Sequence, residues 1–320
     1  MKKLFDIQDI STYRSELMGW AIIWIMMLHF TFTQIKPLGF VAQYGFAGVD
    51  IFMLVSGLGL YYSLHSNQNI LRFYKKRLLR IFPTYYFIGI ISSILFFQDS
   101  ITEYFYRYST IGFWFGGTYW EWYIPSIIIL YLLSPFIKYI LDKNFFILLS
   151  FFSISILAIT LFLIDQHEIL DRVHFFFLYR IPAFILGMVC AFWIKNNIST
   201  KYYYAFLLAG IPIFCYFFPQ HHQLYNYKYF SLLFLLPFFT IFFIVISKNI
   251  NRFNPIIRAI GNASLEIYLI QSILFYALTN DLVIIPSVWH DTITVSLIFL
   301  CSIIGIIIHW AMSKALLKFL

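Results

Sequence analysis

Ten apolar stretches constrain this chain more than any other feature of its sequence. A helix needs about 20 mostly apolar residues to cross the hydrocarbon core of a bilayer. Stretches that approach or meet this length lie near residues 16–34, 47–64, 82–98, 122–140, 145–164, 174–194, 202–218, 229–247, 263–280 and 292–312. Only 11% of the residues are charged, whereas soluble domains carry about 25%. The sequence therefore predicts an all-α, polytopic membrane helix bundle.

The basic residues indicate how this bundle is oriented. Of the 22 Lys and Arg residues, 17 fall in the termini and in the connections on one side of the predicted bundle. Because cytoplasmic loops are enriched in Lys and Arg, that side is predicted to be cytoplasmic, as are both termini. The formal charge of +8 then reflects orientation and contact with anionic lipid, and no basic block long enough for nucleic acid is present. We predict one integral-membrane domain spanning residues 1–320.

Two ionisable residues lie inside the first two stretches. His29 follows Arg14 by fifteen residues, which corresponds to about 22 Å along a helix. Asp50 begins the second stretch, and the alternating topology predicts a similar depth for it. Ionisable groups at membrane depth are costly and mark functional sites. A carboxylate bonded to one imidazole nitrogen makes the other nitrogen a better base, so we predict that Asp50 orients His29.

Two further groups are candidates for binding a ligand. Arg77 and Arg80 are three residues apart and share a helix face, and arginine side chains bind phosphate through paired hydrogen bonds. The alternative is that Arg77 and Arg80 belong to a basic cluster that only sets the orientation of the chain in the membrane. Ser56 and Gly57 lie in the segment SGLG, which makes room for a ligand or simply lets helices approach closely.

A buried basic and a buried acidic residue complete the candidate set. Arg180 lies within an apolar stretch and therefore requires an anionic partner or a water-filled cavity. Glu266 is its acidic counterpart in the ninth stretch, and the sequence leaves open whether the two side chains meet. The His, Cys, Asp and Glu residues show no spacing typical of a metal site, and no glycine-rich nucleotide loop is present.

Six segments, in this order, resemble the integral-membrane acyltransferase 3 family, whose members O-acylate bacterial surface polysaccharides. They are MGWAIIWIMMLH ending at His29, GVDIFMLVSG from Gly48, KKRLLRIFPTYY from Lys75, WYIPSIIILYLLSP from Trp122, RIPAFILG from Arg180 and GNASLEIYLIQ from Gly261. The resemblance implies a ten-helix bundle in a bacterial plasma membrane that transfers an acyl group, usually acetyl from acetyl-CoA, to a hydroxyl. It further implies that His29 is catalytic and that Arg77 and Arg80 hold the donor.

The chain departs from the family pattern at two positions within these segments. Many members carry a basic residue eleven positions before the histidine, where this chain has Met18, and we expect Arg14, one helical turn earlier, to replace it. Many members also end the ninth-stretch segment with histidine, where this chain has Gln271. The candidate substrate contacts are Trp122, Tyr123, Arg180, Glu266 and Tyr268, with interfacial anchoring as the alternative for the aromatic residues.

The sequence therefore predicts a membrane O-acyltransferase, with an acyl-CoA donor and a glycan or other hydroxyl acceptor, and without a metal. The main alternative is a transporter or flippase for a lipid-linked sugar or an organic anion. It would use the same buried charges, although no two-half symmetry is visible. A non-catalytic protein of a glycan-export assembly is a third reading. Acceptor identity, acyl chain length and oligomeric state are left open by the sequence.

Overall fold

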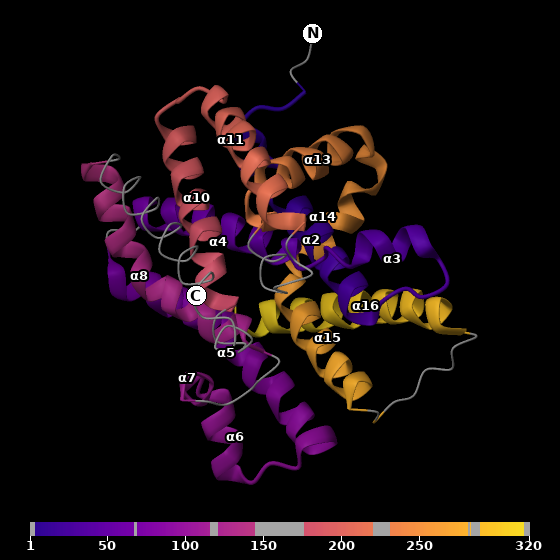
Figure 1. Cartoon of the computed structure of the whole chain (residues 1–320). Helices are drawn as coiled ribbons and strands as arrows, with labels where there is room; N and C mark the ends of the chain where they lie inside the picture. The colour runs from indigo at the N-terminus through magenta and orange to yellow at the C-terminus, as the bar shows by residue number, and fades with distance from the viewer. Residues whose placement is uncertain are drawn as a thin grey trace.

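The computed structural model is helical throughout the part of the chain that it describes (Figure 1). Described are residues 4–66, 69–115, 121–144, 176–219, 231–280, 282 and 289–316, and no strand occurs among them. The shorter helices are α1 (Gln8–Thr12), α3 (Lys36–Ala42), α6 (Ile101–Tyr108), α7 (Ile111–Trp114) and α14 (Asn254–Asn262). The longer helices are α2 (Arg14–Phe30), α4 (Ala47–Ser66), α5 (Ile70–Ser92), α8 (Tyr123–Lys143), α10 (Phe176–Lys195), α11 (Lys201–Phe217), α13 (Leu236–Asn249), α15 (Ser264–Thr279) and α16 (His290–Leu316).

The predicted apolar stretches agree well with these helices. The stretch at 145–164 lies outside the described residues, and each of the others overlaps one of the longer helices. Five helices of the described chain, α4, α5 with its continuation to Phe97, α8, α10 and α16, are long and apolar enough to cross a membrane. The helices α13 and α15 are apolar but shorter.

The region around Pro83 differs from the prediction. The sequence predicts a basic amphipathic helix over 70–84 that runs into Pro83, and then a separate span over 82–98. The structure instead has one helix, α5, that begins at Ile70, contains Pro83, and continues into a π-helical turn, Ser93–Phe97. A proline removes one backbone hydrogen bond, but the flanking apolar side chains pack on both sides of it and the helix continues. The basic half and the apolar half are therefore rigidly joined.

Glycines allow the helices of the core to approach closely. A Cβ atom added at Gly57 in α4 would lie 2.1 Å from the carbonyl oxygen of Phe184 in α10, and one added at Gly187 in α10 would lie 1.9 Å from that of Leu54. Only glycine permits this backbone contact, which is a common way for membrane helices to associate. Gly57, expected to make room for a ligand, is therefore a packing residue.

The helix α2 lies at the centre of the bundle. The helices α4, α13, α14, α15 and α16 all pack against it (Figure 1). The contact with α14 is again made through glycines, because a Cβ atom at Gly19 or Gly261 would lie 2.2 Å or 1.8 Å from a carbonyl oxygen of the facing helix. The residues carried by α2 are consequently fixed by neighbours on every side.

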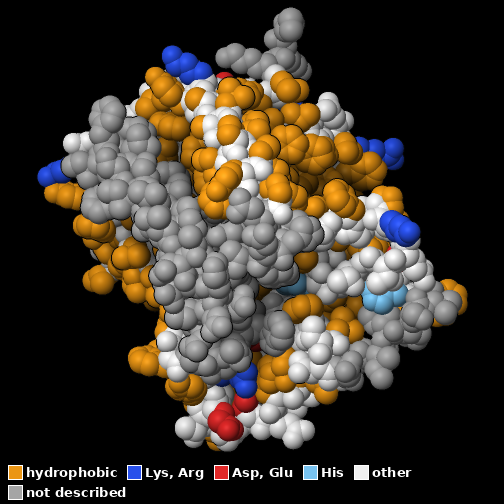
Figure 2. All heavy atoms as spheres, viewed as in Figure 1, with side chains coloured by type: hydrophobic (Ala, Val, Ile, Leu, Met, Phe, Trp, Pro, Cys, Tyr) orange, Lys and Arg blue, Asp and Glu red, His pale blue; other side chains and the backbone are white. Residues whose placement is uncertain are grey.

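The outer surface is apolar, as a bilayer requires. Figure 2 shows hydrophobic side chains gathered over α11 and α13, with charged side chains towards the edges of the molecule. Large exposed apolar side chains include Leu208, Phe238 and Phe242. Contiguous exposed apolar surface of this kind marks contact with lipid or a partner.

Candidate active site

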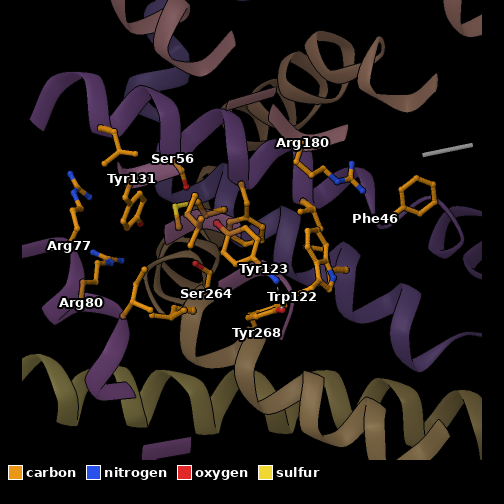
Figure 3. A pocket seen from close by; sticks show the side chains of 18 of the residues that line it. Phe46, Ser56, Arg77, Arg80, Trp122, Tyr123, Tyr131, Arg180, Ser264 and Tyr268 are labelled. Carbon is orange, nitrogen blue, oxygen red and sulfur yellow. Dashed lines mark hydrogen bonds between the residues drawn. The ribbon is translucent and has the colours of Figure 1, made fainter. Parts of the chain in front are cut away.

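One cavity brings together most of the residues that the sequence singled out. Its volume is about 170 Å³. The predicted site residues that line it are Arg14, His29, Ser56, Arg77, Arg80, Trp122, Tyr123, Arg180 and Tyr268. All of these residues except Trp122 lie in one of six helices, α2, α4, α5, α8, α10 and α15. Trp122 immediately precedes α8. Figure 3 shows Arg77 and Arg80 at one end of the cavity and Arg180 near the other, with Ser56 and Tyr123 between them.

Three arginines form one end of this cavity. Arg14 lies close to Gly59, since a Cβ atom there would be 2.7 Å from a guanidinium nitrogen of Arg14. Arg77 donates a long hydrogen bond of 3.5 Å to the carbonyl oxygen of the same glycine. Among the described residues, Arg14, Arg77 and Arg80 form no ion pair with a carboxylate. Guanidinium groups are the side chains that best match phosphate and carboxylate groups through paired hydrogen bonds.

Arg14 and Met18 both line the cavity, and the replacement of the missing basic residue by Arg14 stays a prediction. Met18, which stands where many family members have a basic residue, also lines the cavity, one helical turn from Arg14. The guanidinium of Arg14 lies with those of Arg77 and Arg80, so the positive charge is present although its position in the sequence has moved by one turn. The substitution of Gly59 by any other residue would displace it.

His29 lies at the opposite end of α2 from Arg14 and retains contact with the cavity. Its Nδ1 is 3.1 Å from Oε1 of Gln271 in α15, and its ring stacks on Phe275 at a centroid distance of 4.5 Å. An acceptor oxygen at Nδ1 places the ring proton there and leaves the Nε2 lone pair free. No hydrogen bond to Nε2 occurs within the described chain. The contact with Gln271 is a hydrogen bond in the tautomer that carries its proton on Nδ1, and the Nε2 lone pair is free in that tautomer.

The predicted hydrogen bond between Asp50 and His29 is wrong. Asp50 is fully buried in α4, and its Oδ2 lies 2.6 Å from Nη1 of Arg180 in α10. The requirement for an anionic partner at Arg180 is therefore met by Asp50. A buried guanidinium without such a partner would be very costly, and this demand determines the role of the carboxylate. The residue that contacts His29 is Gln271.

Glu266 lies beside a histidine and not beside Arg180, the pairing that the sequence left open. Its Oε1 lies 3.2 Å from Nδ1 of His309 in α16, and it does not line the cavity. Glu266 and Arg180 therefore do not meet as a pair. Of the predicted site residues, Asp50, Gly57 and Glu266 are the three that stand outside the cavity wall.

Aromatic side chains form the wall between the two ends. The rings of Tyr123 and Tyr268 lie 5.4 Å apart, and the backbone N–H of Tyr123 donates a 3.4 Å hydrogen bond to the Tyr268 hydroxyl. Tyr131 lines the same wall two turns along α8. The apolar side chains of Ile25 and Ile127 complete it. The cavity therefore has three arginines at one end and mainly aromatic and aliphatic side chains along its wall.

Two contacts of this site were not predicted. Gln271 was noted only as a departure from the family pattern, although an amide in an apolar helix indicates a hydrogen-bonding role. Tyr131 follows Tyr123 by eight residues on α8, with Ile127 midway. Spacing of three and four residues places side chains on one helix face, so helical periodicity from Tyr123 would have found Tyr131. No local signal joins Gln271 to His29, because 242 residues separate them.

The fold and the cavity define an all-helical protein of membrane-type composition, with an internal histidine and a cluster of three arginines in one cavity. The acyltransferase domain family model, acyltransferase 3, matches residues 17–312, and the chain belongs to this family. A protein of the Acidianus two-tailed virus, provisionally named acetyltransferase ORF330, is 27% identical in an alignment over 196 residues that covers 57% of this chain and 58% of the relative. The chain thus spans less than two thirds of the length of that relative. No solved structure matches the chain.

Proposed function

We propose that this protein is a membrane O-acyltransferase that moves an acyl group, most simply acetyl, from acyl-CoA to a hydroxyl group of a glycan. Membership of the acyltransferase family supports acyl transfer. The observation that carries the proposal is that one cavity contains three arginines without described counterions and a histidine with a free ring nitrogen. The arginines suit the phosphates of CoA, and the apolar length of the cavity suits its arm.

In the proposed reaction, the phosphates of the donor bind Arg14, Arg77 and Arg80, and the arm passes Ser56 towards His29. Nε2 of His29 accepts the proton of the acceptor hydroxyl, whose oxygen attacks the thioester carbonyl. The carbon–sulfur bond breaks, the thiolate leaves, and the proton on His29 neutralises it. Gln271 holds the Nδ1 proton throughout, so that the imidazole alternates between neutral and charged forms without rotating.

The topology proposed for this reaction has ten membrane spans and cytoplasmic termini in a bacterial plasma membrane. The loop charges support this orientation. It places the end of α2 that carries Arg14 towards the cytoplasm, where acyl-CoA is made, and the His29 end towards the outer leaflet. Trp122 and Tyr123 then lie where a sugar acceptor could stack on them.

The decisive experiment is thiol release from acetyl-CoA by the purified full chain in lipid nanodiscs, with and without a glycan fraction as acceptor. We expect acceptor-dependent release of CoA and a mass increase of one acetyl group on the glycan. The His29→Gln variant, which keeps a hydrogen-bonding side chain but has no basic nitrogen, should be inactive while still inserting in the membrane. Uptake of a labelled glycan or organic anion without any thiol release would support the transporter instead.

A further inference from the structure

The segment that directly follows His29 is held by the start of α16. Oδ1 of Asp291 accepts a 2.8 Å hydrogen bond from the backbone N–H of Thr33. Oδ2 of the same carboxylate accepts bonds of 3.0 and 2.6 Å from the N–H groups of Gln34 and Ile35. Asp291 is only 4% exposed. A charged acceptor that binds three consecutive backbone N–H groups fixes the path of the chain there, because such hydrogen bonds are stronger than neutral ones.

A second residue of α16 holds the end of α2 itself. The Oγ1 hydroxyl of Thr294 donates a 3.0 Å hydrogen bond to the carbonyl oxygen of Phe30, and Thr294 is completely buried. Phe30 is the last residue of α2 and the neighbour of His29. Its carbonyl is one of the groups that a helix leaves without an internal partner. Thr294 supplies that partner, one turn along α16 from Asp291.

The backbone between these two contacts is strained. Thr31 has φ 55° and ψ 163°, which lies beside a region that is essentially restricted to glycine and costs about 1–3 kcal/mol. Strain of this kind persists only where the surroundings impose it. The hydrogen bonds that Asp291 accepts and the one that Thr294 donates lie on either side of Thr31, next to the end of α2 at Phe30.

The same helix also supports the contacts of the imidazole ring. A Cβ atom at Gly305 in α16 would lie 2.3 Å from the side chain of Ile267 in α15, so the two helices are tightly packed. The helix α15 carries Gln271, which bonds Nδ1 of His29, and Phe275, which stacks on its ring. The helix α16 therefore contacts both the end of α2, which carries His29, and α15, which carries the residues that contact the His29 ring.

We propose that Asp291 and Thr294 are positioning residues that set the point where α2 ends and thereby hold the His29 ring, which lines the cavity, against Gln271. The expected effect of these residues on the rate of acyl transfer rests on the proposed function. Their expected effect on the tautomer of His29 follows from the contacts alone and does not depend on that function.

The test compares three variants of the full chain in nanodiscs. Thr294→Val removes the hydroxyl and keeps the shape of the side chain. Asp291→Asn removes the charge and one acceptor oxygen. The matched control is Ser296→Ala, on the same helix, because the Ser296 hydroxyl bonds only the carbonyl of Thr292 in its own helix and the residue is exposed. His29→Gln identifies the His29 signals in the ¹⁵N spectrum of histidine-labelled protein.

In the wild type and in Ser296→Ala, we expect the ¹⁵N spectrum to show a single neutral tautomer of His29, protonated at Nδ1. In Thr294→Val and Asp291→Asn, the two nitrogen signals should move towards each other as both tautomers become populated. The same variants should lower kcat for thiol release by about 10- to 100-fold, because a displacement of about 1 Å can cost that much. The KM for acetyl-CoA should change by less than about two-fold, since the donor-binding arginines are untouched.

Folded Thr294→Val with the wild-type spectrum and kcat would overturn the proposal. If Asp291→Asn does not fold, Thr294→Val decides the question by itself. A wild-type protein that releases no thiol, but whose His29 spectrum changes in Thr294→Val, would refute the proposed function and leave the positioning role established. Equal losses in Thr294→Val and Ser296→Ala would instead show a general weakening of α16 and count against it.

Discussion

The two faces of α2 look into two hollows of opposite character. One face carries Arg14 and His29 and lines the cavity of about 170 Å³. The other carries Trp20, Trp24 and Met27 and lines a hollow of about 610 Å³ that is surrounded by aromatic and aliphatic side chains of α2, α3, α11 and α13. The larger hollow contains none of the charged residues. Size therefore does not indicate where chemistry can occur, whereas charge that is retained at membrane depth does.

The largest expected difference between the two faces concerns His29 and Met27. His29→Ala should lower kcat for thiol release by about 10³-fold, because it removes the proposed general base. Met27→Leu, a change of similar volume on the opposite face, should alter kcat by less than about two-fold. Rates are compared per folded molecule, after size-exclusion chromatography. Comparable losses in both variants would remove the functional distinction between the faces.

The second difference concerns the buried ion pair, which exists only on the cavity side. Asp50→Asn leaves Arg180 buried without a counterion and should lower the free energy of unfolding by about 3–5 kcal/mol. The double variant Asp50→Leu with Arg180→Met should lose much less, because both charges are removed together. Thermal unfolding in detergent measures both effects. A stable Asp50→Asn protein with no activity would restore Asp50 as a catalytic residue.

The third expectation concerns the arginine end of the cavity. Arg77→Ala should raise the KM for acetyl-CoA by about 10- to 100-fold, which corresponds to the loss of a charged hydrogen bond worth about 1.5–3 kcal/mol. The value of kcat should change little, because the proposed reaction gives Arg77 a role in donor binding and none in proton transfer. Lys75→Ala is the control, since Lys75 is an exposed basic residue of the same helix that does not line the cavity. If both variants raise KM equally, the arginines act only through general charge.

The smallest effect is expected in the aromatic hollow. The indole Nε1 of Trp24 donates a 2.8 Å hydrogen bond to the carbonyl oxygen of Val41 in α3. Trp24→Phe should therefore lower the free energy of unfolding by about 1 kcal/mol and leave both kcat and KM unchanged. A clear change in kinetics with this variant would show that the two hollows communicate through α2.

Much of the architecture was predictable because it follows from local composition. Apolar length predicts where helices occur, and this succeeded for each predicted stretch that the structure describes. Helix ends were less predictable. The first stretch was expected to reach residue 34, but α2 ends at Phe30, where Asp291 and Thr294, more than 250 residues away, form hydrogen bonds with the backbone. The sequence also predicts a helix that runs into Pro83 and a separate span after it, whereas α5 runs through Pro83 as one helix. Packing there outweighs the local penalty of proline.

By itself, the sequence determined that this protein is a membrane helix bundle and which ionisable residues it places at membrane depth, because both follow from the cost of transferring groups into hydrocarbon. Only the tertiary structure decided the partners. Asp50 could serve His29 or Arg180, and it neutralises Arg180 because an unpaired guanidinium is the costlier group to bury. His29 is then oriented by Gln271, an amide on a helix distant in the sequence. Pairing depends on which helices lie side by side, and no short-range pattern contains that information.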